Sequence, residues 1–156
     1  VQGNRILVSA IQNASAEFFT FVVNALTERT DTLAQPVFML TIRVALLPRC
    51  VDPEIADIAD PLLQKLCDMA VDLASNDYGN YVVQSMLEHG RPEDQSRIVA
   101  AILENIVSWS TAKIPSNVVS KCFSVMGEDK TNSRRQEHFR ALAQAILGED
   151  SAEDAP

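Results

Sequence analysis

Long apolar runs and glycine are both scarce in this chain. No window approaches the roughly 18 uncharged apolar residues of a membrane-spanning helix, so we expect no membrane span and no membrane partner. Glycine contributes five of the 156 residues, whereas residues that favour helices are plentiful. The shortage of glycine and the abundance of helix formers together favour an all-α protein.

Paired cysteines are absent as well. Cys50, Cys67 and Cys122 are odd in number, far apart and set in apolar surroundings, and no CxxC spacing occurs. A disulfide framework or a zinc site needs paired spacings, so we expect no metal and reduced, buried thiols in an intracellular protein. The chain begins at Val1 without a signal-peptide pattern, which is typical of a piece of a longer protein.

The usual catalytic signatures are missing too. The sequence has no glycine-rich phosphate loop followed by Lys, no HExxH, and no Ser or Cys beside a suitable base. The segment "QGNR" (2–5) is too short to count as a phosphate motif. We therefore expect neither an enzyme nor a cofactor nor a small-molecule substrate.

The net charge argues against a general nucleic-acid binder. It is −8, and Lys and Arg supply most of the non-specific affinity for phosphates. The acidic residues are clustered, however, because four lie in "DPEIADIAD" (52–60) and four in "GEDSAEDAP" (148–156). Of the 21 acidic residues, 13 remain elsewhere, against 13 basic ones. The body of the chain is therefore neutral and its acidity is local.

An internal repeat organises the chain. The segment "GNYVVQSMLEHG" (79–90) resembles 3–14, 115–127 and, more weakly, 39–50. The equivalent anchor positions are Asn4, Leu40, Asn80 and Ser116. They are separated by 36, 40 and 36 residues, and the longer interval contains the acidic segment 52–60, which indicates a short loop insertion. A repeat of this length predicts stacked structural units.

A second set of amphipathic segments alternates with the first. It comprises 15–28, 61–74, 92–106 and 133–147, and two of these segments begin with Pro at a favourable helix-start position. The last segment ends at Gly148, which suits a helix C-terminus. We expect an α-solenoid of about three helix-pair units and a partial one over 1–148. The acidic tail 149–156 is expected to be disordered.

The helix at the third anchor combines apolar and polar residues. At 100° per residue, Asn80, Tyr81 and Gln84 fall near 0°, 100° and 40°, opposite Val82 and Met86. The polar trio is expected to line the concave surface of the solenoid. Two amides can match the donor and acceptors of the uracil edge, and an aromatic ring supplies a stacking face.

The segment "DYGNYVVQSMLEHGRPEDQSRIVAAILENI" (77–106) resembles a repeat of the Pumilio (PUF) family of RNA-binding proteins. The segment "PSNVVSKC" (115–122) resembles the repeat that follows it. The resemblance implies a right-handed α-solenoid that binds single-stranded RNA sequence-specifically, one base per repeat. It implies that Asn80 and Gln84 contact the base edge, that Tyr81 stacks on the base, and that the base is uracil.

The other units match this pattern less completely. The resemblance gives Ser116 and Ser120 the base-edge positions and Asn117 the stacking position. Ser116 and Asn117 match the family's guanine-reading combination. That combination has Glu at the second base-edge position, where this chain has Ser120. In the first unit Asn4 matches an edge residue and Arg5 a stacking residue. The unit at 40 offers no reader, since it has Leu40, Thr41 and Val44 at these places.

Two functions follow from the resemblance. The first is RNA binding on messenger RNA 3′ untranslated regions for post-transcriptional and translational regulation in the cytoplasm, with the nucleolus as the alternative. Its partners would be mRNA-repression or deadenylation factors. With about half the repeats of a full family domain, the chain is expected to bind weakly alone. The second is a degenerate solenoid that serves as a protein–protein interaction scaffold with little RNA binding.

The remaining polar and aromatic residues around these helices have structural interpretations. Tyr78 and Gly79 are expected to shape the entry to the helix at 80. His89 and Arg91 are expected to face solvent rather than phosphate, and Trp109 is expected in the core between repeats.

Overall fold

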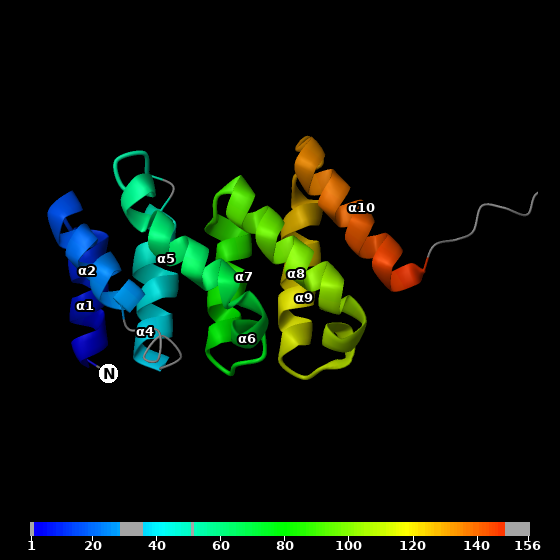
Figure 1. Ribbon diagram of the computed structural model, residues 1–156, viewed down its shortest axis with the longest axis horizontal. Coiled ribbons are helices and arrows are strands. Elements are labelled where there is room, and N and C mark those ends of the chain that lie inside the picture. The colour runs from blue at the N-terminus through cyan, green and yellow to red at the C-terminus, as the bar shows by residue number, and fades with distance from the viewer. Residues whose placement is uncertain (1, 29–35, 51, 149–156) are drawn as a thin grey trace, which may run out of the picture.

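The computed structural model describes residues 2–28, 36–50 and 52–148, and every regular element in these ranges is a helix (Figure 1). The elements are α1 (Gln2–Gln12), α2 (Ala16–Glu28), α4 (Pro36–Thr41), the π-helix η1 (Ile42–Leu46), the 3-10 helix η2 (Leu47–Arg49), α5 (Ala56–Asp68), α6 (Ala70–Ala74), α7 (Gly79–His89), α8 (Pro92–Thr111), α9 (Pro115–Glu128) and α10 (Ser133–Leu147). The predicted all-α class is confirmed. The acidic tail 149–156 lies outside the described residues.

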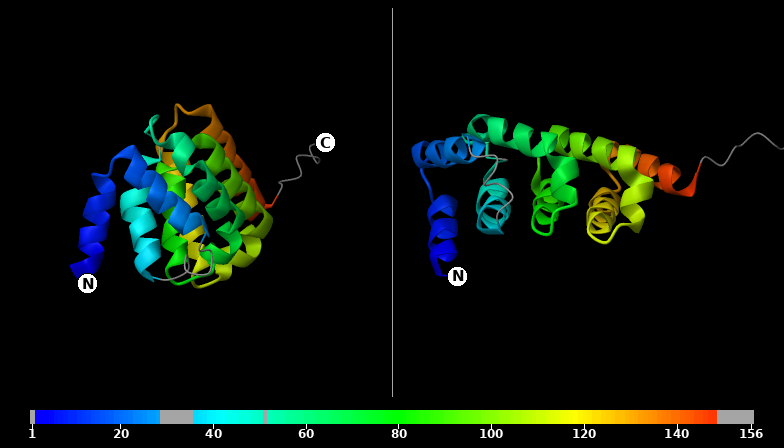
Figure 2. Two further views of the ribbon diagram at one scale, coloured as in Figure 1. Left: turned by 60° about the vertical axis from the view of Figure 1, so that its left-hand side comes forward. Right: turned by 60° about the horizontal axis from the view of Figure 1, so that its bottom comes forward.

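The helices form two layers, most clearly in the right-hand view of Figure 2. One layer contains α1, α4 with η1 and η2, α7 and α9, which carry the four anchor positions; we call it the reader layer. The other contains α2, α5, α8 and α10 and is called the outer layer. Helix pairs repeat along one axis, so the architecture is the expected α-solenoid of Pumilio-type repeats.

The core lies between the layers. Apolar residues that recur at helical spacing put one stripe of each helix there. On α7 this stripe includes Val82, Val83, Met86 and Leu87, all fully buried. The same core includes Leu62, Leu63 and Leu66 of α5, Ile98 and Ile102 of α8 and Val118 and Cys122 of α9. Each large apolar side chain buried in this way stabilises the fold by about 1.5 to 3 kcal/mol.

The helix predicted over 61–74 differs from the observed one at both ends. Helix α5 begins at Ala56, so Pro61 lies inside it rather than at its start. The apolar stripe explains the extension, because Ile55 and Ala59 are buried and continue it toward the N-terminus. Pro61 removes one hydrogen bond of the second turn, and burial outweighs that loss. The acidic segment 52–60 is therefore partly helical. At the other end the helix breaks at Met69, whose ψ is 5°.

The π-helix η1 has a cause in the sequence. Pro48 has no N–H to donate to the Val44 carbonyl, and its ring collides with that carbonyl in a regular α-helix. The chain widens into η1 before Pro48, and Gln12 Nε2 of the first unit donates to Val44 O at 3.3 Å instead. Arg49 donates to Ile11 O at 2.8 Å and so holds the same segment against α1.

Arg91 joins two outer-layer helices, which corrects the expectation that it faces solvent or phosphate. Its guanidinium lies 2.7 Å from Asp94 Oδ2 and 2.8 Å from Asp60 Oδ1. The Asp94 side chain is 2% exposed, so the ion pair is largely shielded from water. The two carboxylates raise the pKa of Arg91 further above its usual range, against the lowering effect of burial.

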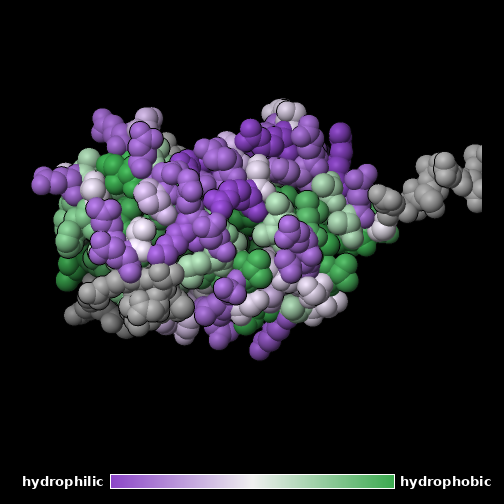
Figure 3. Space-filling model, viewed as in Figure 1, coloured by the Kyte–Doolittle hydropathy of each residue, from purple (hydrophilic) through white to green (hydrophobic). Residues whose placement is uncertain are grey.

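The last helix of the described solenoid has well-defined ends. Helix α10 has a conventional start, where Arg135 N donates to Asn132 Oδ1, and it ends at Gly148 with a φ of 78°, as predicted. Exposed apolar side chains occur at both ends, with Ile6 72% and Phe21 67% exposed on α1 and α2 and Leu147 84% exposed on α10. The outer layer is mostly hydrophilic along its middle (Figure 3). Among the described helices, none combines the length and apolar character needed to cross a bilayer.

Candidate nucleic-acid interface

Helix α7 has a buried face and an exposed one, as predicted. Val82 and Met86 are fully buried, whereas the Tyr81 side chain is 49% exposed and Gln84 is half-buried. The helix starts against α6 at Gly79, where a Cβ atom would lie 2.8 Å from the Leu73 carbonyl oxygen. Only glycine allows this close approach, so the predicted structural role of Gly79 is confirmed.

Asn80 lies on the buried side of this helix, and its predicted position on the exposed face is wrong. It is 3% exposed. Its Nδ2 donates to the carbonyl oxygens of Asn76 and Asp77, both at 2.9 Å, and its Oδ1 accepts a 2.9 Å hydrogen bond from Gln84 Nε2. Asn80 thus fixes the turn before α7 and orients Gln84. Its contact with a base edge stays a prediction, since a base would have to replace one of these bonds.

Gln84 keeps hydrogen-bonding capacity at the surface. Its Nε2 uses one of two hydrogens on Asn80, and within the described residues its Oε1 forms no hydrogen bond. The second N–H and the oxygen give one donor and one acceptor beside the exposed Tyr81 ring. Such a pair can recognise a polar, planar edge stacked on the ring.

The unit at Ser116 presents a weaker version of this arrangement. Asn117 and Ser120 are exposed, and Ser116 is half-buried with its hydroxyl donating to Lys113 O at 3.4 Å. The three predicted positions therefore lie together at the surface of α9. Lys121 adds a positive charge there, although Glu88 of α7 lies 3.1 Å from its Nζ.

The first unit presents Arg5. This residue is exposed on α1, and Val8 is half-buried one turn further along the helix. Asn4 belongs to α1, but its side chain lies outside the described residues. The predicted stacking role of Arg5 stays a prediction.

The second unit has a different register from the one that the repeat predicts. In the first half of this unit Met39 is buried as Asn80 is, at 2% and 3% exposed. Leu40 is exposed as Tyr81 is, at 41% and 49%. This match gives an offset of 41 residues, not the predicted 40. Beyond η1 the exposed Pro48 matches the exposed Glu88 at an offset of 40. The wide turn of the π-helix accommodates the one extra residue.

This register gives Arg43 the place that Gln84 has in α7. Both side chains are half-buried, and both lie three residues after an exposed one. Thr41, which the repeat put in the stacking position, is 1% exposed. The sequence signal for this change of register is Pro48. It follows a mainly apolar helical segment, and the helix widens just before it.

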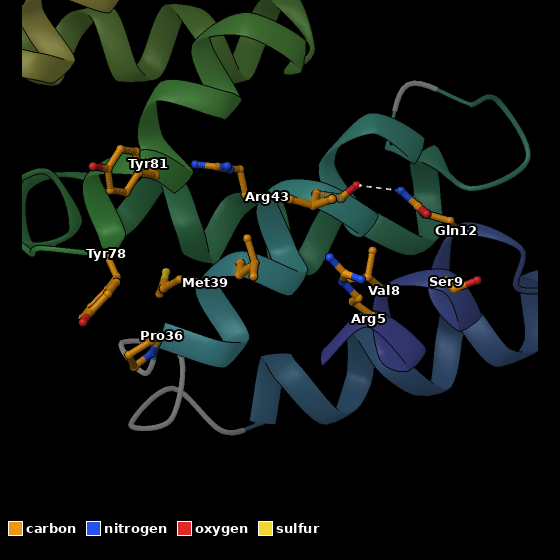
Figure 4. Close-up of a pocket in the computed structure, with 11 residues that line it drawn as sticks. Arg5, Val8, Ser9, Gln12, Pro36, Met39, Arg43, Tyr78 and Tyr81 are labelled. Carbon is orange, nitrogen blue, oxygen red and sulfur yellow. Dashed lines mark hydrogen bonds between the residues drawn. The ribbon is translucent and has the colours of Figure 1, made fainter. Parts of the chain in front are cut away.

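Two hollows open on the reader layer. The larger cavity, of about 750 Å³, lies between α1, α4 and α7 (Figure 4). Its lining includes Arg5, Val8, Met39, Leu40, Arg43, Val44, Tyr78 and Tyr81. The smaller cavity, of about 400 Å³, is lined by Arg43, Val44, Pro48, Tyr81, Gln84, Ser85, Glu88, His89 and Lys121. Tyr78 was expected to pack at the entry to α7. It is instead 49% exposed and lines the larger cavity.

Arg43, Val44 and Tyr81 line both cavities. The guanidinium carbon of Arg43 lies 5.5 Å from the centroid of the Tyr81 ring, which is a cation–π contact (Figure 4). Within the described part of the chain neither Arg43 nor Arg5 forms an ion pair. These two arginines are therefore free to meet phosphates or bases, despite the negative net charge.

The three thiols are inert structural groups. Cys50, Cys67 and Cys122 are unpaired and buried, and burial raises the pKa of each thiol to about 12. Among the described residues no group of His, Cys, Asp or Glu side chains is arranged to hold a metal ion. Trp109 is 6% exposed in α8, which confirms its predicted place in the core.

The stacked helix pairs make this chain a helical-repeat solenoid, and one of its layers presents an aromatic ring beside an amide. Residues 70–103 match a family model described as "Pumilio-family RNA binding repeat". Residues 70–103 thus carry a Pumilio-type repeat, and the chain is similar to Pumilio-domain proteins. It is 27% identical over 124 residues to the Pumilio domain-containing protein C6G9.14 of Schizosaccharomyces pombe, which covers 78% of this chain and 17% of that protein.

Two further relatives agree. Pumilio homology domain family member 4 of Saccharomyces cerevisiae is 27% identical over 125 residues, which is 78% of this chain and 14% of the relative. Pumilio homolog 4 of Arabidopsis thaliana is 35% identical over 46 residues, or 30% of this chain and 5% of the relative. The chain thus spans less than a fifth of the length of these curated relatives.

Proposed function

We propose that the chain binds single-stranded RNA through its reader layer and selects a uracil at α7. The observation that carries this proposal is the exposed Tyr81 ring beside the free donor and acceptor of Gln84. Stacking on an aromatic side chain contributes about 1 to 3 kcal/mol per base. The amide of Gln84 then discriminates between base edges, with Asn80 as its support.

The distribution of charge supports RNA rather than opposing it. Arg5, Arg43 and Lys121 line the two cavities of the reader layer, while the acidic segment 52–60 begins the outer-layer helix α5. Phosphates that follow the reader layer would therefore meet local positive charge. Such contacts position the strand, and base contacts select its sequence.

The biological role is proposed from the family. The matched family model describes RNA binding, and a reader of single-stranded RNA suits messenger RNA and its 3′ untranslated regions. We propose post-transcriptional regulation in the cytoplasm, with one base read per intact repeat. Repression or deadenylation factors are the partners that this role calls for. The nucleolus is the alternative compartment.

Selection from a randomised RNA pool tests this function. Because the 156 residues alone are expected to bind weakly, the parent is carried in a longer chain that supplies further repeats, and it is expected to enrich a motif that contains a uracil. The double variant Tyr81→Ala/Gln84→Ala is expected to lose that preference, because it lacks both the stacking face and the edge reader. Gln144→Ala is the matched control, since Gln144 is an exposed amide on the outer-layer helix α10. No enrichment by the parent would overturn the proposal.

A protein-interaction scaffold is the second candidate. The observation that favours it is the apolar lining of the larger cavity by Val8, Met39, Leu40 and Val44. The pool experiment distinguishes the two functions, since a scaffold gives no motif that depends on Tyr81 and Gln84.

A further inference from the structure

The larger cavity is not needed for uracil selection at α7. Tyr81 lines both cavities, whereas Gln84, the edge reader of the proposed function, belongs to the lining of the smaller one. The larger cavity has the amide of Gln12, whose Nε2 already donates to Val44 O at 3.3 Å. Binding of a base at α7 therefore leaves the larger cavity available to another ligand.

The walls of the larger cavity are mainly aliphatic. Val8 comes from α1, Met39 and Leu40 from α4, Val44 from η1 and Tyr81 from α7 (Figure 4). Leu40 is 41% exposed there, so part of this apolar wall faces water. Covering such a wall with an apolar group is favourable, and the wall offers few partners to a polar base edge or a phosphate. The lining therefore favours a ligand with an aliphatic or aromatic side chain.

The cavity extends over three consecutive units of the reader layer. Its lining runs from Arg5 of α1 to Tyr78 and Tyr81 at the start of α7, which covers two steps between neighbouring helices. Packed helices lie about 8 to 10 Å apart, so two steps cover about 16 to 20 Å. An extended chain rises about 3.3 Å per residue, so a peptide segment of about five or six residues has this length.

The charge of this cavity is positive, although the net charge of the chain is −8. Arg5 and Arg43 line it, and none of its described lining residues carries a carboxylate. Arg5 is exposed, and Arg43 lies over the Tyr81 ring. Neither forms an ion pair in the described part of the chain. The two guanidinium groups therefore attract a ligand with carboxylates and repel a basic one.

We propose that the larger cavity is a docking groove for an acidic, apolar peptide segment of a partner protein. A large apolar side chain of the segment covers Leu40 and Val44, and an Asp or Glu of the segment lies beside Arg5. The apolar contact supplies the affinity, and the two arginines select the sign of the charge. This site goes beyond RNA selection at α7 and gives the scaffold function a class of partner.

Selection from a library of random heptapeptides on phage, with the 156-residue chain immobilised, tests the groove. The chain is expected to enrich peptides in which Leu, Met or Phe lies next or next but one to Asp or Glu. The most enriched peptide is then synthesised, together with a twin in which Lys replaces each acidic residue. Fluorescence polarisation is expected to show that the acidic peptide binds at least about tenfold more tightly than its twin.

Leu40→Ser and Arg5→Glu assign this binding to the groove. Leu40→Ser shortens the apolar wall and is expected to weaken binding of the acidic peptide about fivefold or more. Arg5→Glu leaves one positive and one negative charge, so the preference over the Lys twin is expected to fall below about twofold.

Matched controls lie on α10, outside the lining of the groove. Ile146→Ser shortens an apolar side chain that is 47% exposed, and Arg140→Glu reverses the charge of an exposed arginine. Both should bind the acidic peptide like the parent. Circular dichroism verifies folding, and Arg5→Glu carries the test by itself if Leu40→Ser does not fold.

Three results would overturn the inference. A parent that enriches no peptide removes the groove as a docking site, and RNA binding that Leu40→Ser weakens would then assign the groove to RNA. An acidic peptide that binds both variants as tightly as the parent has its site elsewhere. Enriched peptides without acidic residues contradict the selection by charge. Uracil selection is measured separately through Tyr81 and Gln84, so each of these results leaves the proposed function intact.

Discussion

Gln84 Nε2 donates a 2.9 Å hydrogen bond to Asn80 Oδ1, so a buried amide holds a surface amide in place. Asn80 in turn donates to two carbonyl oxygens of the turn before α7. The two residues that the repeat pattern treats as equal readers therefore have different functions. One belongs to the fold, and the other is available to a ligand.

The first prediction separates these functions by stability. Asn80→Ala removes, at a buried position, the two hydrogen bonds that Nδ2 donates to the turn before α7, and it is expected to lower the free energy of unfolding by about 1 to 3 kcal/mol. Gln84→Ala, at a half-buried surface position, is expected to change it by less than about 0.5 kcal/mol. Urea denaturation of both variants measures the difference. Equal stability of the two variants would contradict the assigned role of Asn80.

The sequence predicts most of the fold because the apolar residues repeat with a helical period. That period identifies the buried face of α7 through Val82 and Met86, and Gly148 marks the end of α10. The two failures occur at prolines. At Pro61 the apolar stripe carries α5 through the proline, and at Pro48 the helix widens into η1. Local propensity cannot decide between these outcomes, because packing against neighbouring units determines each.

The candidate site is less predictable than the fold for the same reason. A one-residue change of register moves a side chain by about 100° around a helix, which is enough to exchange Thr41 for Leu40 at the surface. The sequence therefore indicates Tyr81 and Gln84, where the helix is regular. Arg43 emerges only when the geometry of η1 is known.

The second prediction compares two ion pairs in the outer layer. Arg91→Met leaves the Asp94 carboxylate buried without its partner and is expected to cost about 3 to 5 kcal/mol. Arg97→Met removes an exposed pair with Asp68, whose side chains are 44% and 69% exposed, and is expected to cost less than about 1 kcal/mol. Thermal or urea unfolding distinguishes the two. Similar losses would show that Asp94 is solvated after all.

The third prediction concerns two glycines. In Gly90→Ala the new Cβ would lie 2.2 Å from the Met86 carbonyl oxygen, which also accepts the Gly90 N–H. This backbone contact cannot relax without opening the end of α7, so we expect a loss of about 2 kcal/mol or more. In Gly127→Ala the nearest atom is a ring carbon of Phe139 at 3.1 Å. A side chain can shift, and alanine favours the helix, so we expect a change near zero.

Thermal unfolding of both alanine variants checks this order. Gly127→Ala serves as the control for the general effect of replacing glycine by alanine in the reader layer. A Gly90→Ala variant as stable as Gly127→Ala would mean that the end of α7 adapts to a side chain.

The fourth prediction concerns stability at alkaline pH. Burial raises the pKa of the Cys122 thiol from 9.0 to about 12, so the folded chain keeps the thiol protonated where the unfolded chain ionises it. The stabilisation is fully present below pH 9 and is lost as the pH rises toward 12. Over this window the thiol lowers the free energy of unfolding by about 1.4 kcal/mol per pH unit.

Comparison with Cys122→Ala isolates this contribution, because tyrosines and lysines that ionise in the same range are present in both proteins. The variant is less stable at pH 8, since it loses buried volume. Its free energy of unfolding is nevertheless expected to fall less steeply between pH 9 and 11 than that of the parent under reducing conditions. Parallel pH profiles from urea denaturation would mean that the thiol is solvated in the folded chain. Converging profiles would show that the Cys122 thiol, on the helix that also carries Asn117 and Ser120, stays buried and protonated in the folded chain.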